Sequence, residues 1–164
     1  MIRIESRQKE FEQQARDLAS NLTSEKKRNN RIQKLGELWR GNEGGRCRCP
    51  IGEPSPKFER VQPTKEAIAI LNEIFLSASE ETQIVIVRAL VRPEPFVDDA
   101  MNILLTAIKS ERVKVRINAV RTIRYIGSSA KPYLSDVLFL KNDPILAVKS
   151  EIEGLEAYLN EVGT

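Results

Sequence analysis

The sequence contains no histidine, only 5% aromatic residues and two cysteines among 164 residues. Without histidine the chain has no Ser-His-Asp or Cys-His catalytic arrangement, no histidine acid or base and no zinc site that uses histidine. Two cysteines are too few for a four-cysteine zinc site or for the disulfide framework of a small secreted protein. We therefore expect a protein that is not an enzyme and that carries no cofactor or metal ion.

Long apolar segments and a strong net charge are missing as well. The most apolar segments, residues 84–87 and 134–140, are far shorter than the roughly 18 residues of a membrane span. The N-terminus is charged from Arg3 onward, unlike a secretory signal. The net charge of +3 does not by itself favour nucleic acid. These features predict a cytoplasmic chain with no membrane partner, and its length suits one domain with an appendage.

Residues 1–40 contain no proline, and their apolar residues recur at helical spacing, which predicts an amphipathic helical arm. The arm is either one long helix or two helices hinged near Thr23. Its candidate contacts are Phe11, Leu18 and Trp39. These side chains pack on the rest of the chain, on a second copy of the chain or on a partner, so a homo-oligomer formed through the arm is one option.

Residues 41–63 hold four of the eight glycines and four of the eight prolines, which predicts a linker between the arm and a second unit at residues 64–164. Cys47 and Cys49 lie in this segment beside two arginines. Neighbouring guanidinium groups lower the pKa of a thiol, so the cysteines are candidate redox thiols. The alternative is that both are incidental loop residues.

After residue 63 the spacing of apolar residues again indicates helices, in six short segments that form hairpin pairs. Thr64 and Asp143 stand where side chains cap the start of a helix, and Ser110 matches Asp143 as a cap. Another helix begins near Ser79, and Gly127 stands where one ends. The predicted helices cover residues 64–77, 79–91, 96–108 and 110–126, and two more follow Pro132 and Asp143.

Two of these segments are related by an internal repeat. Residues 110–126, SERVKVRINAVRTIRYI, align with residues 143–159, DPILAVKSEIEGLEAYL, at a constant offset of 33. Repeats of roughly this length that consist of two helices are the units of α-solenoids, in which each unit covers its apolar face with a neighbour. The repeat therefore predicts stacked helical hairpins.

The repeated residues resemble HEAT-like repeats, including the kind found in phycobilisome lyases. The resemblance covers about residues 80–159 and is carried by Val115-Arg116, Ala119, Ile123 and Ile126-Gly127, then by Asp143-Pro144, Val148-Lys149 and Leu155. It implies an all-α fold: a short right-handed α-solenoid of about three helical hairpins with an N-terminal helical arm. It also implies a ladder of charge pairs between repeats, in which Arg116 and Asp143 form one rung, whereas Ser110 and Lys149 depart from the pattern.

Two clusters of basic residues are candidate surfaces for a partner or for nucleic acid. The first comprises Lys109, Arg112, Lys114, Arg116, Arg121 and Arg124, and the second comprises Lys26, Lys27, Arg28 and Arg31. Such clusters attract phosphate or an acidic partner. The alternative is that they neutralise acidic neighbouring repeats and solvate the outer surface.

Three functional hypotheses follow. The first is a non-enzymatic scaffold or adaptor, built on HEAT-like repeats, whose partner is another protein. The second is a nucleic-acid-binding helical-repeat protein that uses the two basic clusters. The third, which the resemblance implies, is a bilin-handling subunit similar to phycobilisome lyases.

Overall fold

A computed structural model of the chain describes residues 2–19, 24–40, 61, 63–91 and 93–161. Within these ranges every regular element is helical and none is a strand, which confirms the predicted all-α class. The α-helices are α1 (Ile2–Ala19), α2 (Glu25–Arg40), α3 (Lys65–Ser77), α4 (Glu80–Ala89), α5 (Val97–Ala107), α6 (Val113–Ile126), α7 (Leu134–Val137) and α8 (Leu146–Glu161). Two 3-10 segments, η1 (Gly127–Tyr133) and η2 (Leu138–Asn142), flank α7.

The predicted helix starts and stops at Thr64, Ser79 and Gly127 are confirmed. The Thr64 side chain accepts a hydrogen bond from the backbone N–H of Ala67 at 3.2 Å, and that of Ser79 accepts from Thr82 at 3.3 Å. Each bond satisfies a first-turn N–H that has no partner within its helix. Gly127 ends α6 with a positive φ of 74°, which a residue without a Cβ adopts freely.

Three helices differ from their predicted extent. α8 begins at Leu146, three residues after the predicted cap Asp143, and the Asp143 carboxylate accepts a hydrogen bond from the N–H of Ile145 just before the helix. α6 begins at Val113, three residues after the predicted start at Ser110, because the backbone at 110 and 111 is bonded to the Arg116 side chain instead of entering the helix. The helix expected after Pro132 is short, and 3-10 segments lie on both sides of it. Pro132 lies inside η1, where its missing N–H and its ring interrupt α-helical hydrogen bonding.

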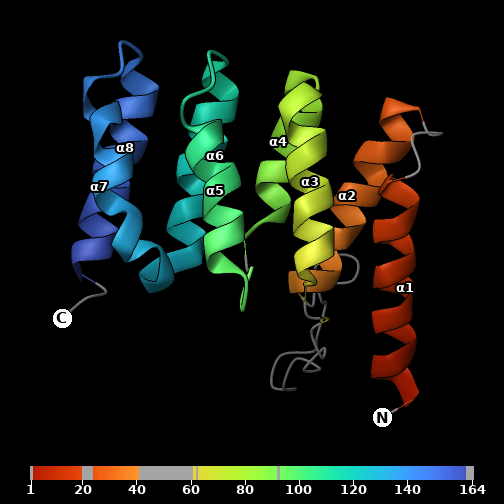
Figure 1. The fold of residues 1–164 in the computed structure, drawn as a ribbon. Coiled ribbons are helices and arrows are strands. Elements are labelled where there is room, and N and C mark those ends of the chain that lie inside the picture. The colour runs from red at the N-terminus through yellow and green to blue at the C-terminus, as the bar shows by residue number, and fades with distance from the viewer. Residues whose placement is uncertain (1, 20–23, 41–60, 62, 92, 162–164) are drawn as a thin grey trace, which may run out of the picture.

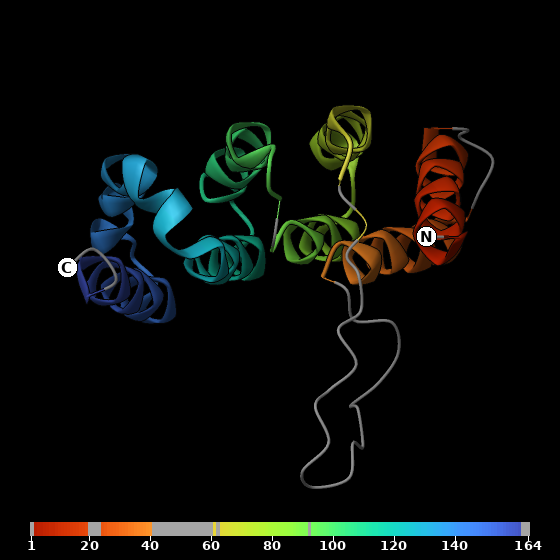
Figure 2. The same cartoon turned by 90° about the horizontal axis from the view of Figure 1, so that it is seen from below.

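The helices form two layers that run side by side as a row (Figures 1 and 2). One layer contains α1, α3, α5 and α7, and the other contains α2, α4, α6 and α8. In the second layer each helix packs against the next, α2 on α4, α4 on α6 and α6 on α8. The row bends gently with this second layer on its inner side, so we call its exposed surface the inner face.

One hydrophobic core runs through the row from α1 to α8. Phe11 and Leu18 of α1 are buried in it, as are Ile32 and Leu35 of α2. Residues 1–40 were expected to be an arm with a separate organisation, and this packing corrects that expectation. The apolar stripe of α1 and α2 is buried against α3 and α4, so the helices share one core.

Part of the predicted linker, residues 41–60 and 62, lies outside the described residues, and so does the side chain of Trp39. Among the helices that the structure describes, none combines the length and the apolar character required to cross a membrane.

Candidate functional site

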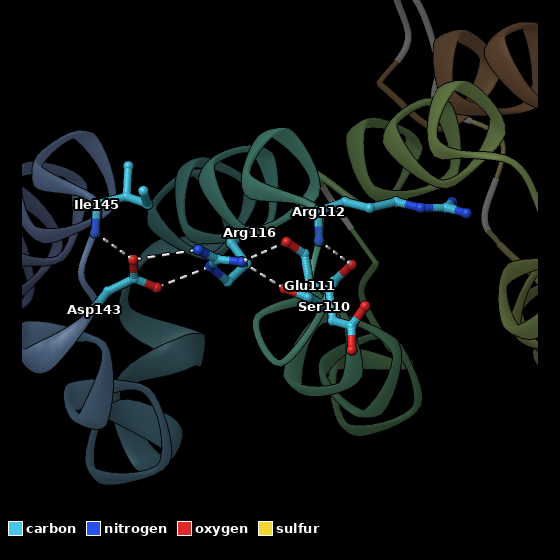
Figure 3. A network of polar contacts seen from close by, with 6 residues as sticks. All are labelled: Ser110, Glu111, Arg112, Arg116, Asp143 and Ile145. Carbon is cyan, nitrogen blue, oxygen red and sulfur yellow. Dashed lines mark hydrogen bonds and ion pairs between the residues drawn. The ribbon is translucent and has the colours of Figure 1, made fainter.

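Arg116, in the middle of the basic cluster at residues 109–124, is buried and points into a contact between α6 and α8 (Figure 3). Its Nε lies 2.9 Å from Oδ2 of Asp143 in an ion pair, and its Nη2 donates a hydrogen bond to Oδ1 at 3.2 Å. Its Nη1 donates to the carbonyl oxygens of Ser110 and Glu111, at 2.7 and 3.1 Å. Four protein oxygens therefore surround this guanidinium, which is not offered to a ligand.

Asp143 completes this contact from the other side. Its Oδ1 also accepts a hydrogen bond from the backbone N–H of Ile145, at 2.8 Å, immediately before α8. Figure 3 shows the resulting chain of contacts, from the loop before α6 through Arg116 to the start of α8. The sequence predicts a charge pair between Arg116 and Asp143, and the structure contains it.

Arg112 and Arg121 also contact neighbouring helices. The Arg112 side chain extends away from Asp143 (Figure 3), and its Nη1 donates to the carbonyl of Ala78 at 3.1 Å and to Oε1 of Gln83 at 3.0 Å. Arg121 donates from Nε to Oε1 of Glu151 on α8 at 2.7 Å, and this hydrogen bond raises the pKa of its guanidinium. Each of these arginines joins α6 to one neighbouring helix.

The remaining members of the cluster are dispersed. Lys109 and Lys114 are exposed at the loop before α6 and in its first turn. Arg124 is half-buried and packs against Gly154 of α8. A Cβ added to Gly154 would lie 3.3 Å from Nη1 of Arg124. The six basic residues therefore do not gather into one open positive stripe.

The basic cluster near the N-terminus is likewise divided. Arg31 joins α2 to α1: its Nη1 donates to the carbonyl of Asp17 at 3.2 Å, and its Nη2 lies 3.6 Å from the Asp17 carboxylate. Arg28 is half-buried, whereas Lys26 and Lys27 are exposed.

A further polar contact joins α2 to the start of α4. Oε1 of Glu25 accepts hydrogen bonds from the hydroxyls of Ser79 and Thr82, the latter at 2.9 Å. The buried Thr82 hydroxyl also lies 2.8 Å from Oδ1 of Asn29. The bond from Ser79, followed by that from Thr82, lowers the pKa of the Glu25 carboxyl. Polar side chains thus link every neighbouring pair of inner-face helices.

The inner face is hollowed between α4 and α6. This groove has a volume of about 510 Å³ and is lined by Arg88, Val91, Asn118, Arg121, Thr122 and Tyr125. Tyr125 is 67% exposed, although it is one of the largest side chains of α6. A smaller hollow of about 130 Å³ lies between α2 and α4, and Arg88 lines it as well.

Sequence analysis identified Arg121 but missed Arg88 and Tyr125. The missed signal is the repeat offset: Arg88 precedes Arg121 by 33 residues, and Tyr125 precedes Tyr158 by the same distance. The offset gives Arg88 and Arg121 equivalent positions on neighbouring helices, and both line the groove. Extending the offset backward from α6 into α4 reveals this pair.

Within the described part of the chain, no group of three acidic or cysteine side chains is arranged to hold a metal ion. The candidate thiols Cys47 and Cys49 lie outside that part. Phe11 and Leu18, two of the three candidate contacts of the arm, are buried in the core. They therefore pack on the rest of the same chain, which is one of the three roles expected for them.

Comparison of the chain with protein-family models, with curated proteins and with solved structures finds no match in any of the three. Function is therefore inferred from the residues and contacts of the chain itself.

Proposed function

We propose that the chain is a non-enzymatic HEAT-like repeat protein, a short α-solenoid that binds another protein through its inner face. Three observations support the repeat architecture. The sequence repeats at an offset of 33 residues, successive inner helices pack on one another, and Arg116 pairs with Asp143 between repeats. Such rows of helical pairs present extended surfaces that bind partners.

The observation that carries the binding function is the groove between α4 and α6. Tyrosine and arginine are enriched among the residues that contribute most to protein–protein affinity, because each combines a large contact area with directional hydrogen bonds. Arg88, Arg121 and Tyr125 meet at this groove, and the Tyr125 ring is mostly exposed to solvent. A ring of this size at the edge of a groove is suited to an interface.

The dispersal of the basic residues favours a protein partner over nucleic acid. Binding to a phosphate backbone requires several cations that together neutralise successive phosphates. Arg116 is buried on Asp143, and Arg112 is bonded to α4. Two of the six residues of the first cluster are thereby engaged within the protein, and the other four do not form one continuous positive stripe.

Photo-crosslinking in the cells that make the protein tests this function. A benzophenone amino acid is placed at position 125 on the inner face and, as a matched control, at position 76 on α3 in the other layer. The native side chains at these positions are 67% and 68% exposed. We expect protein adducts at position 125 and few at position 76. Equal labelling at both positions, no adducts, or adducts removed by nuclease contradict the proposal.

A further inference from the structure

We propose that the groove between α4 and α6 binds an acidic segment of the partner protein, with one carboxylate at Arg88 and another at Arg121. This inference rests on the proposed function and names the chemistry of the partner at that site. Arg88 is exposed on α4 and lines both hollows of the inner face. It therefore places a positive charge at the centre of this surface, which is complementary to a carboxylate.

Arg121 presents the second guanidinium in a fixed orientation. It donates from Nε and Nη2 to the same oxygen of Glu151, and the Arg121 side chain remains 53% exposed. A guanidinium carries five N–H groups, so this contact leaves three for a ligand. Glu151 is only 16% exposed and holds the guanidinium from α8. A side chain already fixed in this way loses little conformational freedom when it binds a carboxylate.

The spacing of the two arginines suggests the form of the bound segment. Arg88 and Arg121 occupy equivalent repeat positions on adjacent helices, and the axes of packed helices lie about 8–10 Å apart. In a polyproline II segment, every third side chain faces the same side, at intervals of about 9.3 Å. An acidic residue at every third position of such a segment, crossing the helices, matches the two arginines.

Apolar groups of the groove complete the match. Tyr125 follows Arg121 by four residues on α6 and exposes its ring, and Val91, in the turn that follows α4, also lines the groove. Aromatic-lined grooves bind polyproline II segments because this conformation is already formed in the free peptide. Tyr125 and Val91 therefore contact the residues between the acidic positions.

Peptides of defined sequence test the inference on the full-length chain. The probe is a fluorescent dodecapeptide with glutamate at every third position and proline elsewhere, and fluorescence anisotropy measures its binding. The comparison probes are a peptide of the same composition with its four glutamates contiguous, a peptide with lysine in place of glutamate, and a uridine dodecamer. We expect the spaced glutamate peptide to bind about tenfold more tightly than any of the others.

Charge-reversal variants locate the site. We expect Arg88→Glu to weaken binding of the spaced peptide at least about tenfold, and Lys109→Glu, which makes the same change in charge outside the groove, by less than about twofold. Both residues are exposed, so both variants keep the fold, which circular dichroism verifies. Equal effects of the two variants, or equal binding of the spaced and contiguous peptides, overturn the inference.

Two further outcomes separate this inference from the proposed function. If position 125 forms protein adducts but no glutamate peptide binds, the acidic-segment inference fails and the protein-binding function stands. If the uridine oligonucleotide binds more tightly than the peptides, and Arg88→Glu abolishes that binding, the groove is a nucleic-acid site and both proposals fail.

Discussion

Gly36 of α2 packs directly against Ala89 of α4. A Cβ at position 36 would lie 2.9 Å from Cα of Ala89 and 3.0 Å from its Cβ, closer than side chains pack in folded proteins. The two helices therefore approach each other at a residue with no side chain on α2 and a small one on α4. This contact is one of those that join residues 1–40 to the remaining helices.

Gly36→Ala is expected to destabilise the fold, although alanine favours helix formation by about 1 kcal/mol over glycine. The backbone of Ala89 has to move, and overpacking of this kind costs about 1–3 kcal/mol. The matched control is Gly154→Ala, whose Cβ meets only the flexible end of Arg124 at 3.3 Å and which we expect to be neutral or stabilising. Urea unfolding monitored by circular dichroism compares the two, and equal effects contradict the close packing of α2 on α4.

Phe11→Ala tests whether α1 packs within one chain. Phe11 is fully buried in the shared core, and truncation of a buried phenylalanine costs about 3–5 kcal/mol. We expect this loss in thermal unfolding at every protein concentration, because the contacts are made inside one molecule. Leu76→Ala, at a side chain that is 68% exposed, serves as the control. The contrary result is a thermal unfolding midpoint that rises with protein concentration in the parent chain but not in Phe11→Ala. That result would show that α1 pairs two chains.

The buried ion pair between α6 and α8 predicts a large difference between two arginine substitutions. Arg116→Leu leaves Asp143, whose side chain is 5% exposed, without its counter-charge, and such a loss costs about 3–5 kcal/mol. Arg121→Leu removes a pair whose arginine is half exposed, and we expect a loss below about 1 kcal/mol. Denaturant unfolding of both variants measures the difference, and similar losses would contradict a structural role for Arg116.

The Glu25 carboxylate predicts a pH dependence of stability at the α2–α4 contact. Hydrogen bonds from Ser79 and Thr82 lower its pKa in the folded protein below the ordinary value of 4.5. The stabilisation is therefore complete above that value and is lost as the pH falls through the lowered pKa. We expect the stability difference between the parent chain and Glu25→Gln to be constant near neutral pH and to shrink under acidic conditions. Unfolding curves from about pH 6 down to about pH 3 test this, and a difference independent of pH contradicts it.

Much of the fold follows from local patterns in the sequence. Thr64, Ser79 and Gly127 mark helix ends through hydrogen bonds and dihedral angles that depend only on nearby residues. The start of α6 is different, because the Arg116 side chain competes for the backbone at residues 110 and 111. Pairing with Asp143, which is 27 residues away, holds Arg116 in place. A pattern of apolar spacing does not contain such a contact.

The candidate site is less visible in the sequence than the fold. The basic cluster along the chain predicts a positive surface. Its side chains instead point in different directions, that of Arg112, just before α6, toward α4 and that of Arg121 toward α8. The groove arises from two helices, so no contiguous segment encodes it. Only the repeat offset connects Arg88 with Arg121 before the structure is known.

The contacts along the row of helices also differ in the length of chain that they close. Contacts between α4 and α6 and between α6 and α8 join residues 27–30 positions apart, whereas Thr82 of α4 meets Asn29 and Glu25 of α2 across 53 and 57 positions. Closing a longer loop costs more chain entropy before any contact compensates for it. Because a doubling of loop length costs only about 0.6 kcal/mol, the contact of α2 with α4 carries a slightly larger entropic cost than the contacts among α4, α6 and α8.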